Sequence, residues 1–457
     1  MYQTTSIKQK IRLFFMIFFP ILVTQVSLNL MTFFDTVMSG QAGAQDLAGV
    51  AIGSSLWVPV FTGINGILLA ITPIIAHLLG AKENKSIAKK VQQAIYLSIG
   101  LAVVILLMGL FALNPILNTM DLEVEVRHIA KYYLITLGAG IIPLFIFNTL
   151  RCFMDAIGQT RISMIIILIA LPINILFNYI FIFGKFGFPA LGGIGAGVAT
   201  ALTYWMICIF AVAILIRMKP FRGYQVFSTW VKPKLTDWLE QLKIGIPIGF
   251  AIFFETSIFS AVTLLMSEYS TNTIAAHQAA MNFSSLLYMI PLSVGMALTI
   301  TVGFEVGAKR MVDAKIYGYI GIAGGIFIAL FNGVILYVFN DFVASLYNAD
   351  PDVMALTVQF IGYAIVYQLA DAFGAPIQGA LRGYKDVNMT LIIALISYWV
   401  IGLPTGWILA NYTNLGPFGY WVGIITGLSF GAILLLVRLL HIQKKHRISI
   451  QQNSSAM

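Results

Sequence analysis

Long apolar runs dominate the pattern of hydrophobic and polar positions along the chain. A helix needs about 20 mostly apolar residues to cross the hydrocarbon core of a bilayer, and twelve such runs can be read from the sequence. They lie near residues 11–37, 47–78, 91–114, 129–150, 162–183, 191–216, 243–267, 274–304, 316–340, 353–377, 389–410 and 416–437. The second and eighth runs are long enough for a bent helix that continues beyond the bilayer. The pattern therefore predicts an all-α polytopic membrane protein with twelve transmembrane helices.

The composition supports this fold class. Of the 457 residues, 59% are hydrophobic and only 10% are charged, whereas a soluble domain carries about 25% charged residues. This excludes soluble enzymes and disordered scaffolds, because the chain lacks the polar residues that would cover a soluble core. The two cysteines, Cys152 and Cys208, are too few for a disulfide framework.

The net charge of +9 is explained by the placement of the basic residues. With the N-terminus in the cytoplasm, all of the 27 Lys and Arg residues fall on the inner side except Arg127, Lys131 and Lys185. This is the positive-inside distribution of a membrane protein, so no nucleic-acid partner is needed. We expect a multi-pass protein of the plasma membrane with both termini in the cytoplasm.

A polar stretch divides the predicted helices six and six. The expected domains are an N-terminal lobe at 1–216, a cytoplasmic linker at 217–242, a C-terminal lobe at 243–440 and a cytoplasmic tail at 441–457. An even number of spans per half makes the halves a parallel repeat. We expect the two lobes to enclose a cavity between them, an arrangement that suits alternating access better than a continuous pore.

The two halves resemble each other at a fixed offset of 227 residues. Pro20 aligns with Pro247, and Gly80-Ala81-Lys82 aligns with Gly307-Ala308-Lys309. Near the end of each half, Gly192 aligns with Gly416 at an offset of 224. Because proline bends a transmembrane helix, Pro20 and Pro247 are the best hinge candidates.

Acidic residues inside a span are costly and therefore mark functional positions. We expect only Asp35, Glu255 and Asp371 to lie well inside spans, and all basic residues to lie at span ends or in loops. A transported Na⁺ at these carboxylates is possible, but no structural metal and no cofactor is expected.

In the first half, Asp35 borders a polar stripe on one face of its helix. The stripe consists of Gln25, Asn29, Thr32 and Thr36. In another span, Asn174 and Asn178 are four residues apart and therefore share a helical face. Carboxylate and amide oxygens suit a hard cation such as Na⁺, and a protonatable Asp suits H⁺ equally well. Interhelical hydrogen bonding is the alternative role.

In the second half, Glu255 and Asp371 form the candidate cation site. Two carboxylates in one apolar lobe repel each other, so a proton or a cation must neutralise one of them. Tyr367 lies one helical turn before Asp371 and offers a ring face to a cation. His277, Gln278 and Asn282 are further candidates, although a structural interhelical role for His277 stays open.

Four long segments resemble the multidrug and toxic compound extrusion (MATE) family, in particular its NorM branch. They are FFDTVMSG at 33–40, PINILFNYIFIFGKFGFPALGGIGAGVATALTYW at 172–205, AAHQAAMNFSS at 275–285 and DAFGAPIQGALRGYKD at 371–386. The resemblance covers nearly the whole chain and implies two six-helix lobes in a V-shape. It associates Glu255, Asp371 and Tyr367 with cation binding, and Asp35, Asn174 and Asn178 with coupling.

These observations predict a monomeric antiporter that exports lipophilic organic cations and other drugs in exchange for Na⁺ or H⁺. No motif for ATP binding, hydrolysis or metal catalysis occurs in the sequence, so we expect a transporter and not an enzyme. The alternative is a flippase for a lipid-linked precursor, which would require basic residues in the interior. A channel is least supported, because no filter-like re-entrant loop is evident.

Overall fold

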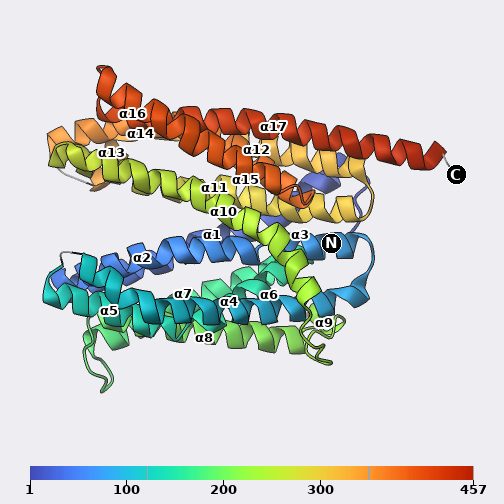
Figure 1. Ribbon diagram of the computed structural model, residues 1–457, viewed down its shortest axis with the longest axis horizontal. Coiled ribbons are helices and arrows are strands. Elements are labelled where there is room, and N and C mark those ends of the chain that lie inside the picture. Colours follow the sequence, from blue (N-terminus) through green and yellow to red (C-terminus); the bar gives the residue numbers. More distant parts are fainter. Residues whose placement is uncertain (121, 348–349, 456–457) are drawn as a thin grey trace. The chain divides into compact units, whose positions relative to one another are not determined.

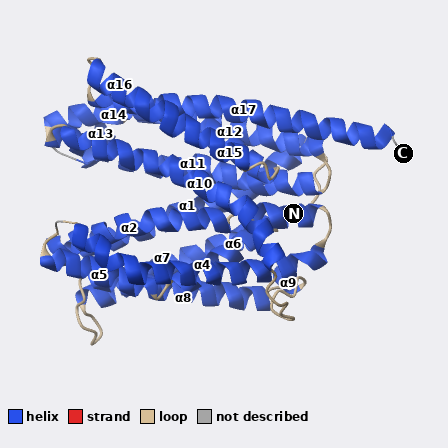
Figure 2. Cartoon of the chain, viewed as in Figure 1, coloured by secondary structure: helices blue, strands red, loops and turns tan. Residues whose placement is uncertain are grey.

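The computed structural model describes residues 1–120, 122–347 and 350–455, and nearly all of this chain is helical (Figures 1 and 2). The helices of the first half are α1 (Ile7–Ala42), α2 (Ala44–Leu68), α3 (Ile71–Gly80), α4 (Asn84–Thr119), α5 (Val124–Gly138), α6 (Ile141–Ala156), α7 (Thr160–Phe183), α8 (Gly193–Arg217) and α9 (Lys219–Arg222). Those of the second half are α10 (Leu235–Leu265), η1 (Met266–Glu268), α11 (Thr271–Gly307), α12 (Met311–Val338), α13 (Asn340–Tyr347), α14 (Pro351–Gly383), α15 (Asn388–Ala394), η2 (Leu395–Gly402), α16 (Leu403–Tyr412) and α17 (Pro417–Ser455).

The predicted transmembrane pattern is confirmed. Within the described residues, eleven helices are long and apolar enough to span a membrane, and the bent pair α5–α6 raises the number to twelve. The bend between α5 and α6 is 51°, and the fourth predicted run crosses it. The eleventh run contains a π-helical stretch, η2, which the apolar pattern did not indicate. Residues 456–457 of the predicted tail lie outside the described residues.

The chain forms two compact units whose boundaries fall inside two long helices. One unit contains Met1–Leu22 and the chain from Phe250 onward, and the other contains Val23–Gly249. We call them the C-unit and the N-unit. Helices α1 and α10 therefore each begin in one unit and continue in the other. The lobe boundaries predicted from the sequence assign the whole of the first helix to the N-terminal lobe, and the two observed units differ from them there.

Side-chain packing explains why the start of α1 belongs to the C-unit. Its buried residues share one hydrophobic core with buried residues of α11, α12, α14 and α17. The α1 members are Leu13, Phe14, Ile17, Phe18 and Ile21. At the corresponding place in the N-unit, Gly249 of α10 lies so close to α2 that a Cβ atom would come within 2.6 Å of the Gly63 carbonyl oxygen.

An ionic contact holds the first turns of each of these two helices. Lys10 pairs with Asp313 at 2.9 Å and lies over the Tyr317 ring. At the repeat-equivalent position of α10, Asp237 pairs with Lys90 at 3.0 Å. The repeat keeps the contact between the same pair of helices and reverses its charges.

Backbone geometry confirms the internal repeat. Lys82 and Lys309 both adopt positive φ angles, of 61° and 60°, in turns that end equivalent helices. Gly192 and Gly416 have φ angles of 55° and 52° immediately before α8 and α17. Glycine tolerates this left-handed conformation at little cost, so each half uses the same device to start its last helix.

Close helix–helix approaches fix the positions of the polar residues described below. In the N-unit, a Cβ atom on Gly195 of α8 would lie 2.4 Å from the Phe181 carbonyl oxygen of α7. In the C-unit, one on Gly379 of α14 would lie 2.1 Å from the Gly295 carbonyl oxygen of α11. Small residues let backbones touch in this way, and α11, α12, α14 and α17 accordingly run side by side (Figure 1).

Candidate functional site

The N-unit holds a buried carboxylate between three helices. Asp35 projects from α1 toward α7 and α8, and its Oδ1 accepts a hydrogen bond of 2.5 Å from Nδ2 of Asn178. Its Oδ2 accepts a second bond, of 3.0 Å, from the Thr200 hydroxyl. Asn178 Nδ2 also donates to Asn174 Oδ1 at 3.2 Å. The structure therefore brings Asp35, Asn174 and Asn178 together.

Thr200 is the member of this cluster that the sequence analysis missed. It lies in α8, and the apolar residues around it in the sequence do not indicate a contact with Asp35. Its contact with Asp35 depends on the packing of α8 against α7. Asn174 Nδ2 and Asn178 Oδ1 are buried without a hydrogen-bond partner among the described residues. The cluster thus combines a carboxylate with amide oxygens, which are suitable ligands for a hard cation.

The polar stripe of α1 does not join this cluster. Thr32 and Thr36 are exposed, and their hydroxyls donate to the carbonyls of Leu28 and Thr32 in their own helix. Asn29 is also exposed, whereas Asp35 is buried on another face. The members of the stripe are three or four residues apart and share one helical face, but this is a different side of the helix from the carboxylate.

The C-unit holds Glu255 of α10 in a chain of hydrogen bonds. Its Oε2 accepts a bond of 3.2 Å from Gln378 Nε2 of α14, and Gln378 Oε1 accepts one of 3.2 Å from Arg382 Nη2. The Tyr288 hydroxyl of α11 donates a long bond of 3.5 Å to Glu255 Oε1. Glu255, Gln378 and Arg382 are all buried.

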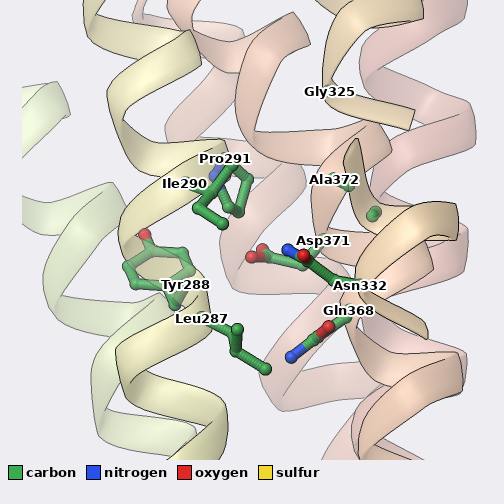
Figure 3. A pocket seen from close by; sticks show the side chains of 10 residues that line it. Leu287, Tyr288, Ile290, Pro291, Gly325, Asn332, Gln368, Asp371 and Ala372 are labelled. Carbon is green, nitrogen blue, oxygen red and sulfur yellow. The ribbon is translucent and has the colours of Figure 1, made fainter. Parts of the chain in front are cut away.

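Asp371 lines a small cavity that shares Tyr288 with this network of hydrogen bonds. Figure 3 shows the carboxylate pointing into the cavity beside Asn332 of α12, with Gln368 below it. The Tyr288 ring forms another wall, and its hydroxyl points away from Asp371. Because Tyr288 contacts Glu255 and also lines the cavity of Asp371, it connects the two carboxylates that the sequence paired.

The other predicted residues of this half take separate positions. Tyr367 is buried in an aromatic cluster, with its ring edge-on to Phe259 and Trp421 at centroid distances of 5.7 and 6.5 Å. His277 Nδ1 accepts a hydrogen bond of 3.1 Å from the Trp421 indole, and its Nε2 lies 3.2 Å from the Thr263 hydroxyl. Because the indole can only donate, Nδ1 carries no proton and the imidazole is neutral.

Both ring nitrogens of His277 are therefore occupied by structural contacts. Gln278 is half-buried and Asn282 is exposed on α11. No described contact links either of them to Glu255 or Asp371.

Some charged residues outside the predicted sites are also buried. Arg151 and Arg382 lie at span ends but are buried, as are the acids Asp155 and Glu305. Each has a specific partner that compensates for burial: Arg151 donates to Gln25 at 3.4 Å, and Asp155 accepts from Ser163 at 2.5 Å. Burial of a charge depends on such partners, which a count of apolar residues does not reveal.

Comparison with known proteins places the chain among multidrug transporters. A sequence model of the MatE family matches it twice, over residues 20–180 and 247–408. It is 71% identical to the probable multidrug resistance protein NorM of Oceanobacillus iheyensis over 445 residues, which cover 97% of this chain and 100% of that protein. It is 56% identical to the protein of the same name from Halalkalibacterium halodurans, covering 97% and 96% of the two chains.

Solved structures share the fold. The crystal structure of the eukaryotic MATE transporter AtDTX14 superposes with a TM-score of 0.84 at 20% identity, covering 97% of this chain and 99% of that chain. A Vibrio cholerae MATE transporter, VcmN, superposes with a TM-score of 0.86 at 18% identity, covering 96% and 98% of the two chains.

Proposed function

The chain belongs to the MatE family, and on that premise we propose that it is a secondary active antiporter that exports lipophilic organic cations in exchange for Na⁺ or H⁺. The protein is a multi-pass multidrug efflux transporter of the NorM type and not an enzyme. The coupling ion, the charge of the substrates and the orientation in the membrane are the parts that we propose.

The observation that carries the proposal concerns three of the buried carboxylates, those of Asp35, Glu255 and Asp371. Among the described residues, none of Asp35, Glu255 and Asp371 has a Lys or Arg nitrogen within 4.0 Å, the limit for a direct ion pair. A buried carboxylate without a directly bound countercharge is costly unless a proton or a cation neutralises it. Ions and cationic drugs are therefore suitable ligands for the two carboxylate sites.

The oxygen chemistry of the sites admits either coupling ion. The Asp35 cluster offers carboxylate and amide oxygens to Na⁺, and each carboxylate can also bind a proton. We place the protein in the plasma membrane as a monomer with both termini in the cytoplasm, because that orientation puts most basic residues on the inner side.

A flippase for a lipid-linked precursor is not favoured. It would need free basic side chains to bind a pyrophosphate head group. The buried arginines Arg151 and Arg382 donate to Gln25 and Gln378 instead, and the described cavity next to Tyr288 is lined by the carboxylate of Asp371.

Dye efflux from proteoliposomes tests the proposal. Vesicles that contain the purified protein receive a Na⁺ gradient at equal pH, or a pH gradient without Na⁺, and the loss of ethidium is followed by fluorescence. We expect one gradient to drive efflux and its dissipation to stop it. Ethidium movement that depends on neither gradient would refute ion-coupled export.

A further inference from the structure

We infer that Arg382 is a fixed internal cation that acts through Gln378 to keep Glu255 ionised and oriented, so that Asp371 is the carboxylate left to take up the coupling ion. This inference rests on the proposed function and assigns a role in it to a residue outside the candidate cation site. Arg382 touches neither carboxylate directly, so its role is one of positioning.

The first step is the geometry of the relay. Gln378 and Arg382 are four residues apart and therefore lie on one face of α14. The amide of Gln378 donates to Glu255 through nitrogen and accepts from Arg382 through oxygen, each at 3.2 Å. Its orientation is thus fixed at both ends. Arg382 lies in the last turn of α14, where the helix dipole also favours a positive charge.

The second step is the contrast between the two carboxylates. Glu255 accepts hydrogen bonds from Gln378 and Tyr288, which favour its charged form. For Asp371 no side-chain donor is found among the described residues, and its carboxylate faces the cavity (Figure 3). The neighbouring Gln368 Nε2 is buried without an acceptor. The open ligand position in this region is therefore at Asp371.

The third step is the comparison with the other half of the repeat. Arg151 of α6 and Gln378 of α14 are separated by the repeat offset of 227, and each reaches across to the helix that opens its half, to Gln25 and Glu255 respectively. The bridging contact is thus common to both units. The position equivalent to Arg382 holds Asp155. A positive side chain one helical turn after the bridging residue is therefore found in the C-unit and not in the N-unit.

The electrostatic consequence has a defined sign. Among the described residues, the titratable and charged groups around Glu255 are Arg382, Asp371 and Tyr367 of α14, Tyr288 of α11 and Tyr398 of η2. Arg382 is the only cation among them. A fixed positive charge favours the ionised form of Glu255 and opposes the binding of another cation nearby, which keeps ion binding weak enough for release.

The test uses Arg382→Gln in the full-length protein, with ethidium binding followed by fluorescence while Na⁺ and pH are titrated separately. Loss of the fixed charge should strengthen ion binding by about tenfold, equivalent to about one pH unit. The midpoint should move to lower Na⁺ concentration or, for H⁺ coupling, to higher pH. Arg382→Lys should restore most of the original midpoint. Arg310→Gln, which removes another cation of the C-unit beside Glu305, should leave it unchanged.

Gln378→Leu provides a second route if Arg382→Gln does not yield folded protein. It interrupts the relay while Arg382 remains, and it should move the midpoint in the same direction. If Arg382→Gln and Arg382→Lys move the midpoint equally, or if the wild type responds and neither Arg382→Gln nor Gln378→Leu differs from it, the inference is wrong. A wild-type protein that responds to neither ion would instead refute the proposed coupling, and this inference with it.

Discussion

At the scale of single residues, hydrogen-bond donors from neighbouring helices hold two of the buried carboxylates in place. Asp35 receives donors from α7 and α8, and Glu255 receives them from α11 and α14. An ionised group in an apolar interior needs such partners. Since these amides and hydroxyls supply no countercharge, Asp35 retains its affinity for a proton or a cation, whereas Glu255 also has Arg382 behind Gln378.

Asp35→Asn should abolish coupled efflux and leave the protein folded, because the amide is nearly isosteric but can neither carry charge nor take up a proton. Efflux in proteoliposomes should fall to the level of empty vesicles, while the elution profile and melting temperature stay close to those of the wild type. Asp341→Asn, at an exposed position in α13, is the matched control and should transport normally. Normal transport by Asp35→Asn would remove this residue from the coupling mechanism.

Neutralising Glu255 and Asp371 together should affect ion binding in a markedly non-additive way, because both face the region around Tyr288. Titration calorimetry on Glu255→Gln, Asp371→Asn and the double variant should give an interaction energy of about 0.5–3 kcal/mol. The pair Glu255→Gln with Asp341→Asn should be additive within error. Two small and independent effects for Glu255 and Asp371 would contradict a shared site.

At the scale of elements, α1 and α10 connect the two compact units. Each contains a proline two residues before the point where the helix passes from one unit to the other, at Pro20 and Pro247. Proline removes the backbone hydrogen bond to the residue four positions earlier, here Met16 and Lys243. The missing backbone hydrogen bond in each helix thus lies next to a boundary between the two units, where a hinge is expected.

Replacing either proline by alanine should slow transport without weakening ion binding. The restored backbone hydrogen bond is worth about 0.5–1.5 kcal/mol, and opposing a conformational step by that amount slows it roughly two- to tenfold. Proteoliposome efflux rates for Pro20→Ala and Pro247→Ala, compared with equilibrium ion titrations, would separate the two effects. Pro115→Ala in α4, away from any unit boundary, should have no effect on rate. Wild-type rates in both hinge variants would exclude the hinge role.

At the scale of the whole molecule, the two halves repeat the backbone but not the chemistry. Turns with matching φ angles end equivalent helices at Lys82 and Lys309. The charges at equivalent positions nevertheless reverse, as in Lys10 and Asp237 or in Asp155 and Arg382. Each unit therefore has its own arrangement of polar groups, and the carboxylates lie in different parts of the repeat.

Drug and coupling ion should bind antagonistically. Antiport requires two ligands that favour opposite states or compete for the same carboxylates, since a ligand with equal affinity for both states shifts nothing. Raising Na⁺ or lowering pH should weaken ethidium binding by roughly 5- to 150-fold, and ethidium should weaken ion binding by the same factor. Fluorescence and calorimetric titrations measure the two directions. Affinities that stay flat in both titrations would exclude the mechanism, whereas a response to one ion alone would identify the coupling ion.

The transmembrane helices, the repeat and the candidate carboxylates could all be predicted from the amino-acid sequence. These features follow from local properties: the apolar length of each span, the fixed offset between the halves, and the high cost of an acid in an apolar run. The pairing of Asn174 with Asn178 was also predictable, because residues four apart share a helical face. The same spacing joins Gln378 and Arg382 within the segment DAFGAPIQGALRGYKD, and it was the signal available for the relay.

The tertiary structure alone decided which helix faces meet. Thr200 reaches Asp35 across 165 positions of sequence, and Gln378 reaches Glu255 across 123. Such contacts depend on the rotation and close approach of whole helices, which glycines such as Gly195 and Gly379 set. Burial of Arg382 and the assignment of the first turns of α1 to the C-unit have the same origin. Each depends on partners far away in the chain, and the local pattern of apolar residues contains no information about them.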